Sequence, residues 1–353
     1  MDETLVLISA DSLGRYTGGI LEGLGVPSEQ AAIVAGSLVD ADLCGVASHG
    51  VNLLALYAAR IRSGAMNPEA RVDIVEDGGS TLRIDGGLGP GQVTGVFAMD
   101  QAVQRAQRHG TAAVSVREST HLGALGYYTR RAAEGGVFAM AFQNGPTLVP
   151  PFGGVTPLFS TNPISYAVPA GDEPPIVFDI ASTAVAGNKL ILARKQGKAI
   201  PAGWANDAQG RPTTDPAQAS MSGLQWFGGH KGFGIALLVE VLSGVLTGCA
   251  FGRHESANAT TTGAERVAKG YLFLALDVER FLPLGDFRAR VDALIRDVHA
   301  SAPAEGFDRT YVPGEIEHER RLQRLKDGIP LPRELVAELE GLGAAWGLGA
   351  LTE

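Results

Sequence analysis

Residues 81–119, TLRIDGGLGPGQVTGVFAMDQAVQRAQRHGTAAVSVRES, carry the pattern that decides the fold class. The alternation in TLRID predicts a strand, the glycine-rich run 86–95 predicts a turn, and VFAMDQAVQRAQRHG predicts a helix. TAAVSVRES then predicts a second strand. Because a strand, a helix and a strand follow one another here, we expect an α/β (α+β) fold.

The same stretch imitates a dinucleotide fingerprint, since Gly89–Gly95 has the spacing GxGxxxG between a predicted strand and a predicted helix. Arg117, at the end of the second strand, could reach a ribose 2′-phosphate. Pro90 weakens this hypothesis because it removes a backbone N–H from the loop, and GxG patterns arise easily in a chain with 47 glycines. The alternative is a glycine-rich turn with a purely structural role.

Composition narrows the class of protein further. The 353 residues suggest two or three domains, and 45% hydrophobic against 19% charged residues indicates a compact globule. A net charge of −9 without a Lys/Arg-dense run argues against nucleic acid or an anionic membrane as the main partner. Cys44 and Cys249 cannot build a disulfide framework, and the N-terminus lacks the pattern of a signal peptide. We therefore expect a cytoplasmic protein.

One segment must be weighed as a membrane span. Residues 232–252, GFGIALLVEVLSGVLTGCAFG, are apolar and rich in small residues, with Glu240 near the middle. A bilayer would penalise that acid by a few kcal/mol. We therefore predict a buried core helix.

The rest of the chain divides by its patterns. Helical periodicity occupies the first seventy residues and returns from Asp286, and VDIVEDGGSTLRID predicts a hairpin that turns at 77–79. We predict three units, whose boundaries are 1–75 plus 305–353 (helical), 76–120 plus 160–304 (sheet), and 121–159 (a small inserted lobe).

Four short segments carry candidate chemistry. Ser48-His49 stands where a helix should begin, with Ser48 as its expected N-cap, and histidine suits proton transfer near neutral pH. His121 follows a predicted strand and precedes glycines that open a helix. His230-Lys231 precedes the long apolar helix, whose N-terminus would favour an anion. Each segment also has a structural reading, as a capped surface histidine or a turn, and a turn is the default for Thr161-Asn162-Pro163.

The sequence contains no motif for a metal site or for a serine hydrolase. The seven histidines are scattered without an H-E-x-x-H motif, so no metal site is predicted. No G-x-S-x-G elbow is present, which argues against a serine hydrolase.

Together, eight segments in order resemble the malate/L-lactate dehydrogenase family of the second type, over about residues 35 to 330. Its relatives include ureidoglycolate, sulfolactate and diketogulonate oxidoreductases and Δ1-piperideine-2-carboxylate/Δ1-pyrroline-2-carboxylate reductases. The segments are ADLCGVASHGV, STHLGALGYYTRRAAEGG, STNPISYAVP, FDIASTAVAGNKL, IPAGWANDAQGRPTTDP, FGGHKGFGIALLVEVLSGVLTG, YLFLALDVERF and YVPGE.

The resemblance implies a non-Rossmann fold with a mixed, largely antiparallel central sheet and a helical layer from both chain termini. It implies an oxidoreductase that uses NADH or NADPH and works as a homodimer with its site near the interface. The reaction would transfer hydride to or from a C=O or C=N carbon next to a carboxylate. On this basis the glycine run 86–95 is structural.

The resemblance also assigns residues. His49 would donate the proton with Ser48 orienting it, although some relatives use the histidine that matches His121 as their acid/base. Thr161 would contact substrate. The implied cofactor-binding residues are His121, Leu122, Gly123, Ala124, Leu125, Asp179, Ile180, Ala181, His230, Lys231, Pro313, Gly314 and Glu315.

The chain departs from the family at its expected carboxylate anchor. Family members usually carry arginine at the position of Leu53 and commonly at that of Cys44, and both residues here are uncharged. A bidentate arginine contact is a strong carboxylate anchor. Either another residue holds the acid, or the substrate is atypical. The alternative function is a catalytically weak family-like dimer that binds a ligand or acts as a scaffold.

Overall fold

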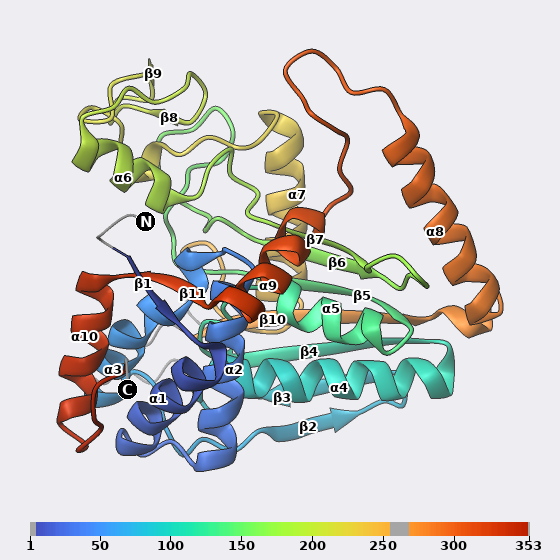
Figure 1. Ribbon diagram of the computed structural model, residues 1–353. Coiled ribbons are helices and arrows are strands. Elements are labelled where there is room, and N and C mark those ends of the chain that lie inside the picture. Colours follow the sequence, from blue (N-terminus) through green and yellow to red (C-terminus); the bar gives the residue numbers. More distant parts are fainter. Residues whose placement is uncertain (1–4, 255–267, 352–353) are drawn as a thin grey trace.

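The centre of the molecule is a seven-stranded sheet, seen in a computed structural model that describes residues 5–254 and 268–351 (Figure 1). The strand order is β2-β3-β4-β10-β5-β6-β7. Only β3 and β4 run parallel in this sheet, and the other neighbouring pairs are antiparallel. The predicted mixed, largely antiparallel sheet is therefore confirmed. Its strands are β2 (Asp73–Asp77), β3 (Thr81–Asp85), β4 (Thr111–Ser119), β5 (Val137–Gln143), β6 (Ile164–Val168), β7 (Ile176–Ile180) and β10 (Lys269–Asp277).

The glycine run 86–95 leads into helix α4 (Gly91–His109), and other residues of the chain occupy the space beside its glycines. A Cβ on Gly91 would lie 2.4 Å from the carbonyl oxygen of His121, and the Gly91 N–H donates to Thr120 Oγ1 at 3.0 Å. A Cβ on Gly95 would lie 2.5 Å from a methyl group of Leu122. These glycines let α4 pack closely against the loop after β4, as a structural turn requires.

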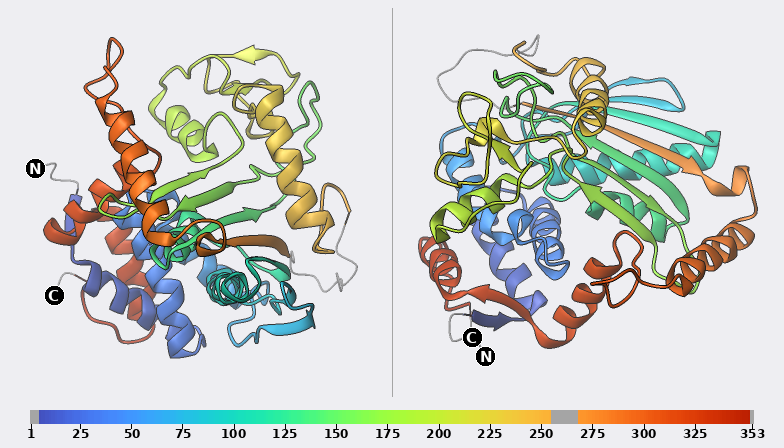
Figure 2. Two further views of the ribbon diagram at one scale, coloured as in Figure 1. Left: turned by 90° about the vertical axis from the view of Figure 1, so that its right-hand side faces the viewer. Right: turned by 90° about the horizontal axis from the view of Figure 1, so that it is seen from above.

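Helices cover both faces of the sheet (Figure 2). On one face α4 and α5 (Gly126–Glu134) bury a cluster that includes Met99, Tyr128 and Phe273. On the other face α7 (His230–Glu240) continues as a π-helical turn, η4 (Val241–Val245), and packs Val239 against Phe142 and Leu272. Helix α8 (Leu284–Ala300) packs near β6 and β7 at the edge of the sheet.

The apolar segment 232–252 differs from its prediction. It forms α7 and η4, and only one side is buried, since Leu237 is 45% exposed and Leu246 62% exposed. Glu240 is buried and accepts hydrogen bonds from Asn162 Nδ2 at 2.8 Å and the Gly252 N–H at 2.9 Å. The expectation of a buried core helix thus holds for one face only. Across the described residues no helix is long and apolar enough to cross a membrane.

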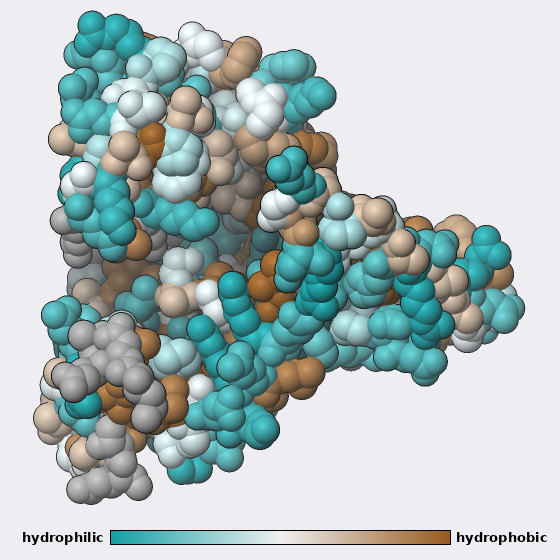
Figure 3. Space-filling model, turned by 45° about the horizontal axis from the view of Figure 1, so that its top comes forward, coloured by the Kyte–Doolittle hydropathy of each residue, from teal (hydrophilic) through white to brown (hydrophobic). Residues whose placement is uncertain are grey.

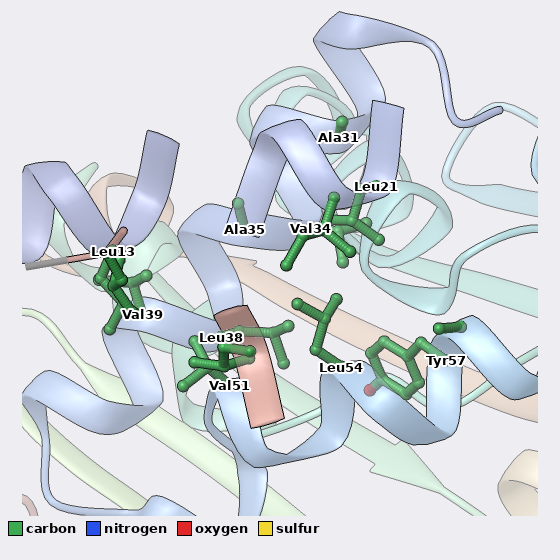
Figure 4. Close-up of a cluster of buried hydrophobic side chains, with 14 of the residues drawn as sticks. Leu13, Leu21, Ala31, Val34, Ala35, Leu38, Val39, Val51, Leu54 and Tyr57 are labelled. Atoms are coloured by element: carbon green, nitrogen blue, oxygen red, sulfur yellow. The ribbon is translucent and has the colours of Figure 1, made fainter. Parts of the chain in front are cut away.

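The two ends of the chain meet in one helical layer, as predicted (Figure 1). Figure 4 shows the N-terminal part of its core, with Leu13, Leu38 and Leu54. Leu13, Leu38, Leu54 and Leu339 belong to a single buried cluster, and β1 pairs antiparallel with β11. The elements are β1 (Leu5–Ile8), α1 (Ala10–Gly23), α2 (Ser28–Leu43), α3 (Leu54–Arg62), α9 (Glu315–Asp327), β11 (Ile329–Pro332) and α10 (Arg333–Ala344).

The segment 121–159, predicted as a small inserted lobe, contributes a strand to the central sheet. β5, which lies within 121–159, is a central-sheet strand because its apolar residues pair with both β10 and β6. A separate cluster around Trp226 instead joins residues 149–159 to the segment 185–236. That segment contains α6 (Gly187–Gln196), β8 (Ala205–Asn206), β9 (Pro212–Thr213) and η3 (Met221–Gly223). The independence of the proposed units stays a prediction.

Candidate active site

His49 stands on a tight corner between α2 and α3. Two 3₁₀ turns, η1 (Ala47–His49) and η2 (Val51–Leu53), form this corner. Ser48 Oγ lies 2.9 Å from His49 Nδ1. The prediction that Ser48 caps a helix is wrong, because α3 begins only at Leu54 and has no side-chain cap. Ser48 instead orients the imidazole.

The backbone of the His49 corner is held by the carboxylate of Asp42, on α2. Its carboxylate accepts the Val51 N–H at 2.8 Å, and a Cβ on Gly50 would lie 2.0 Å from Asp42 Oδ1. Burial raises the pKa of Asp42 to about 7, against the opposing effects of the Val51 amide and the charge of Arg324. Only glycine at position 50 allows this approach.

His121 lies on a second corner, in the loop between β4 and α5. Its Nδ1 lies 3.0 Å from the Tyr57 hydroxyl and accepts the Gly123 N–H at 3.3 Å. Because Tyr57 in turn accepts a hydrogen bond from Gln92 Nε2 at 2.9 Å, its own proton points to Nδ1. A neutral His121 therefore carries its proton on Nε2.

The two corners bring the imidazoles together. The rings of His49 and His121 are stacked, with centroids 5.5 Å apart and planes at 24°. Burial is the main cause that lowers the pKa of His121 to about 3, assisted by the charges of His49, Lys269 and Arg60. Burial also lowers the pKa of His49. Both rings are neutral at pH 7, and protonating one disfavours protonation of the other.

A pocket of about 530 Å³ comes close to this pair along the chain, although neither histidine is part of its wall. Val46 and Ala124, each three residues from one of the histidines, line it together with predicted cofactor residues. Its volume is within the roughly 300–1,000 Å³ of small-molecule sites. Figure 3 shows that this side of the molecule is hollowed between the lobe that carries α6 and the helices of the chain ends. The predicted cofactor residues in its wall are Ala124, Asp179, Ile180, Pro313 and Gly314.

The pocket wall is fixed by backbone contacts. The Val177 N–H donates to the Pro313 carbonyl at 3.0 Å, and a Cβ on Gly314 would lie 2.6 Å from the Val177 carbonyl oxygen. Asp179 Oδ2 accepts the Gly126 N–H at 2.7 Å at the start of α5, and burial raises its pKa to about 6. The wall combines apolar side chains such as Val177 and Ile180 with charged ones such as Arg130 and Arg321. A flat ring and an anionic group can both be held there, so the residues present suit a nicotinamide cofactor.

Other predicted site residues lie elsewhere around the corners. Leu122 and Leu125 are buried in the sheet core, and Leu53 packs against the helical core. Glu315 faces away from the pocket and accepts hydrogen bonds from His299 Nε2 and the Val312 N–H, both at 3.0 Å. Its contacts are those of a residue that holds the start of α9.

His230 and Lys231 lie outside the pocket wall. Both are exposed at the N-terminus of α7. They follow Phe227, whose N–H donates to the Ser182 carbonyl at 3.1 Å, directly after the segment 179–181. Thr161 is linked to the same segment, since its carbonyl accepts the Ser182 N–H at 2.8 Å. His230-Lys231 and Thr161 therefore belong to segments that both bond to the residue after 179–181.

Sequence reasoning missed four polar residues at the corners. Tyr57 and Gln92 orient His121, while Lys269 and Arg60 add charge near it. One signal was available: the lysine of KGYLFLALD is an unusual start for a strand that is otherwise apolar. Tyr57 and Gln92 give no such signal, because their partners lie 64 and 35 residues away in the chain. Among the described residues no group of three or more His, Cys, Asp or Glu side chains is placed to hold a metal ion.

A largely antiparallel sheet with two stacked imidazoles beside it differs from the parallel sheet of a Rossmann enzyme. The family profile described as malate/L-lactate dehydrogenase matches residues 8–340. A malate dehydrogenase of Pyrococcus horikoshii is 35% identical over 359 aligned positions, which cover 99% of this chain and 98% of the relative. The chain belongs to the malate/L-lactate dehydrogenase family.

Two further likenesses support this assignment. A (2R)-3-sulfolactate dehydrogenase (NADP(+)) of Chromohalobacter salexigens is 37% identical and covers 90% of this chain and 92% of the relative. The solved structure of a sulfolactate dehydrogenase from Methanocaldococcus jannaschii superposes with a TM-score of 0.90 at 35% identity and covers 98% of both chains.

Proposed function

We propose that this protein is an NAD(P)H-dependent dehydrogenase or reductase that moves hydride to or from a C=O or C=N carbon next to a carboxylate. The observation that carries the proposal is the stacked His49–His121 pair, with a pocket close to it along the chain. The bound cofactor supplies or accepts the hydride. The substrate class is a 2-oxo or 2-hydroxy acid, or a cyclic imino acid.

The two imidazoles divide the proton chemistry. His49 donates a proton to the substrate oxygen or nitrogen during reduction, and Ser48 fixes its ring through Nδ1. His121, neutral and held by Tyr57, offers its Nε2–H as a hydrogen-bond donor to the same polar atom. Thr161 contacts the substrate from the neighbouring turn, while Leu53 offers no charge for its carboxylate.

The cofactor lies along the pocket in this proposal. Ala124, Asp179, Ile180, Pro313 and Gly314 support it through the wall that they form. The other residues that the resemblance assigns to the cofactor are not part of this wall, and a role for them remains part of the proposal: His121, Leu122, Gly123, Leu125, Ala181, His230, Lys231 and Glu315. NADH and NADPH are both candidates, and a cytoplasmic location is part of the proposal.

Cofactor titration followed by turnover tests this function. Quenching of tryptophan fluorescence by NADH or NADPH, and oxidation of that cofactor with one member of a panel of 2-oxo acids and cyclic imino acids, is expected. Absence of binding with both cofactors would refute the enzyme. Binding without turnover of any panel member would favour the alternative, a catalytically weak dimer with a ligand-binding role, which the uncharged Leu53 supports.

We also infer a homodimer. The outward face of α7 and η4 exposes Leu237, Leu238, Val241, Val245 and Leu246 side by side. Contiguous exposed apolar residues mark interaction surfaces, and a second copy would cover them. Light scattering is expected to give twice the chain mass for the wild type and the monomer mass for Leu246→Glu. A monomeric wild type would refute the dimer.

A further inference from the structure

Lys269 is a buried cation at the end of the central sheet. It opens β10 and is 3% exposed. It is paired with Ser119, the last residue of β4, two residues before His121. A lysine ammonium is seldom buried unless a charge or ligand compensates it.

Its ammonium lies between the His121 loop and the turn that carries Thr161. A Cβ on Gly145 would lie 3.7 Å from Lys269 Nζ and 2.3 Å from Ser160 Oγ. Ser160 directly precedes Thr161, the expected substrate contact. The lysine therefore stands next to the two segments that carry His121 and the expected substrate contact.

Arg60 is a second cation whose charge acts on both Lys269 and His121. Arg60 stands one turn beyond Tyr57 on α3, and its positive charge lowers the pKa of Tyr57, His121 and Lys269. Glu240 is the carboxylate whose charge favours the protonated lysine, and both of its oxygens already accept hydrogen bonds. Arg60 thus adds a second positive charge on the side of the imidazoles.

We propose that Lys269, assisted by Arg60, is the carboxylate anchor of the active site and replaces the arginine expected at Leu53. This inference rests on the proposed function, since it names the group that holds the acid of that substrate. An anion between the two cations would offset their mutual repulsion and the burial of the lysine. The substrate carboxylate would then lie next to the Nε2–H of His121.

The anchor has a pH dependence of its own. Burial, followed by the charge of Arg60, lowers the pKa of Lys269 to about 7, and the opposing influences are Cys249 and Glu240. His121 from the loop after β4 also faces it. As pH rises through 7 in the free enzyme, the lysine loses its proton. Anion binding should therefore weaken above pH 7, whereas an arginine at this position would stay charged.

Calorimetric titration with oxamate, a small 2-oxo-acid analogue, tests the anchor with and without NADH or NADPH. We expect Lys269→Met to weaken oxamate binding by at least about tenfold, and Lys269→Arg to stay within a few-fold of wild type and to lose the decline above pH 7. Lys198→Met, on an exposed loop, is the matched control. Cofactor affinity and melting temperature, measured for each variant, report whether the fold is intact.

The outcomes separate the anchor from the proposed function. If Lys269→Met folds and binds oxamate like wild type, or if wild type binds no oxamate, the anchor is wrong, whatever the cofactor does. If oxamate binding depends on Lys269 but neither cofactor binds, the anchor stands and the dehydrogenase function fails. A melting temperature lowered in Lys269→Met with unchanged oxamate affinity would mean that the lysine only balances Glu240.

Discussion

The His49 corner and the His121 corner hold the same side chain in different ways. His49 sits on two 3₁₀ turns, and the partner of its Nδ1 is the neighbouring Ser48. His121 is fixed by Tyr57 and Gln92 and has its pKa lowered to about 3. A ring with so low a pKa cannot store a proton near neutral pH. Burial lowers the pKa of His49 as well, but its ring is held by the Ser48 hydroxyl alone. The difference indicates a division between a proton carrier and a fixed hydrogen-bond donor.

The strongest test of this division is His49→Asn. Asparagine keeps a polar group but cannot donate a proton, so kcat for reduction should fall by about 10²–10⁴-fold with unchanged cofactor affinity. In wild type, reduction needs protonated His49 and oxidation needs the neutral ring. The rate of reduction should therefore fall, and that of oxidation rise, as pH increases through its lowered pKa. Unchanged turnover in His49→Asn would move the proton donor to the other corner.

The next test is on Asp42, whose carboxylate holds the backbone of the His49 corner. Asp42 loses its proton near pH 4 when unfolded but only at about pH 7 when folded, so its contribution to stability is lost as pH rises through this window. Asp42→Asn keeps an acceptor for Val51 without the charge. Between pH 5 and 8 its unfolding free energy should gain roughly 2–3 kcal/mol relative to wild type. Denaturant titrations with exposed Asp297→Asn as control measure this, and a constant difference would contradict it.

A smaller effect on turnover is expected when the hydrogen bond that holds His121 is removed. Tyr57→Phe removes the donor to His121 Nδ1 and leaves Gln92 Nε2 without its acceptor. The ring can then adopt the other tautomer, and we expect kcat/KM to fall by about tenfold. Tyr166→Phe, on β6 and packed against Phe178, is the control. If the two variants behave alike, the fixed tautomer has no role in the reaction.

Ser48→Ala should have the smallest effect. Its loss frees the His49 ring but leaves the imidazole and the 3₁₀ turns in place, so kcat should fall by about threefold. Ser48→Thr keeps a hydroxyl and should restore most of the rate. A loss as large as that of His49→Asn would show that the serine itself takes part in proton transfer.

The sequence predicts the fold better than the site because the fold depends on local periodicity. The strands around 81–119 and the hairpin before them follow from alternation, and they form as expected. The sequence does not show that β5 belongs to the central sheet, because its pairing with β10 joins residues more than 120 positions apart. No local pattern records such a pairing.

Within the site, the histidines are visible in the sequence because their neighbours are unusual, as in Ser48-His49-Gly50. The surroundings of His121 are not visible in the sequence, since they come from separate elements. Tyr57 bonds to His121, Gln92 bonds to Tyr57, and Lys269 adds its charge. The failed helix cap at Ser48 has the same cause. Asp42, nine residues before Val51, binds the backbone and delays the helix to Leu54.

The pairing of β1 with β11 bears on how the chain acquires its fold during synthesis. Helices α1 to α3 leave the ribosome first, yet the cluster around Leu13 and Leu38 closes only when residues 329–351 arrive. Until then the N-terminal helices lack the residues that complete their apolar cluster, which stays open for most of translation. A ribosome stalled before residue 329 would therefore hold an unfinished N-terminal layer.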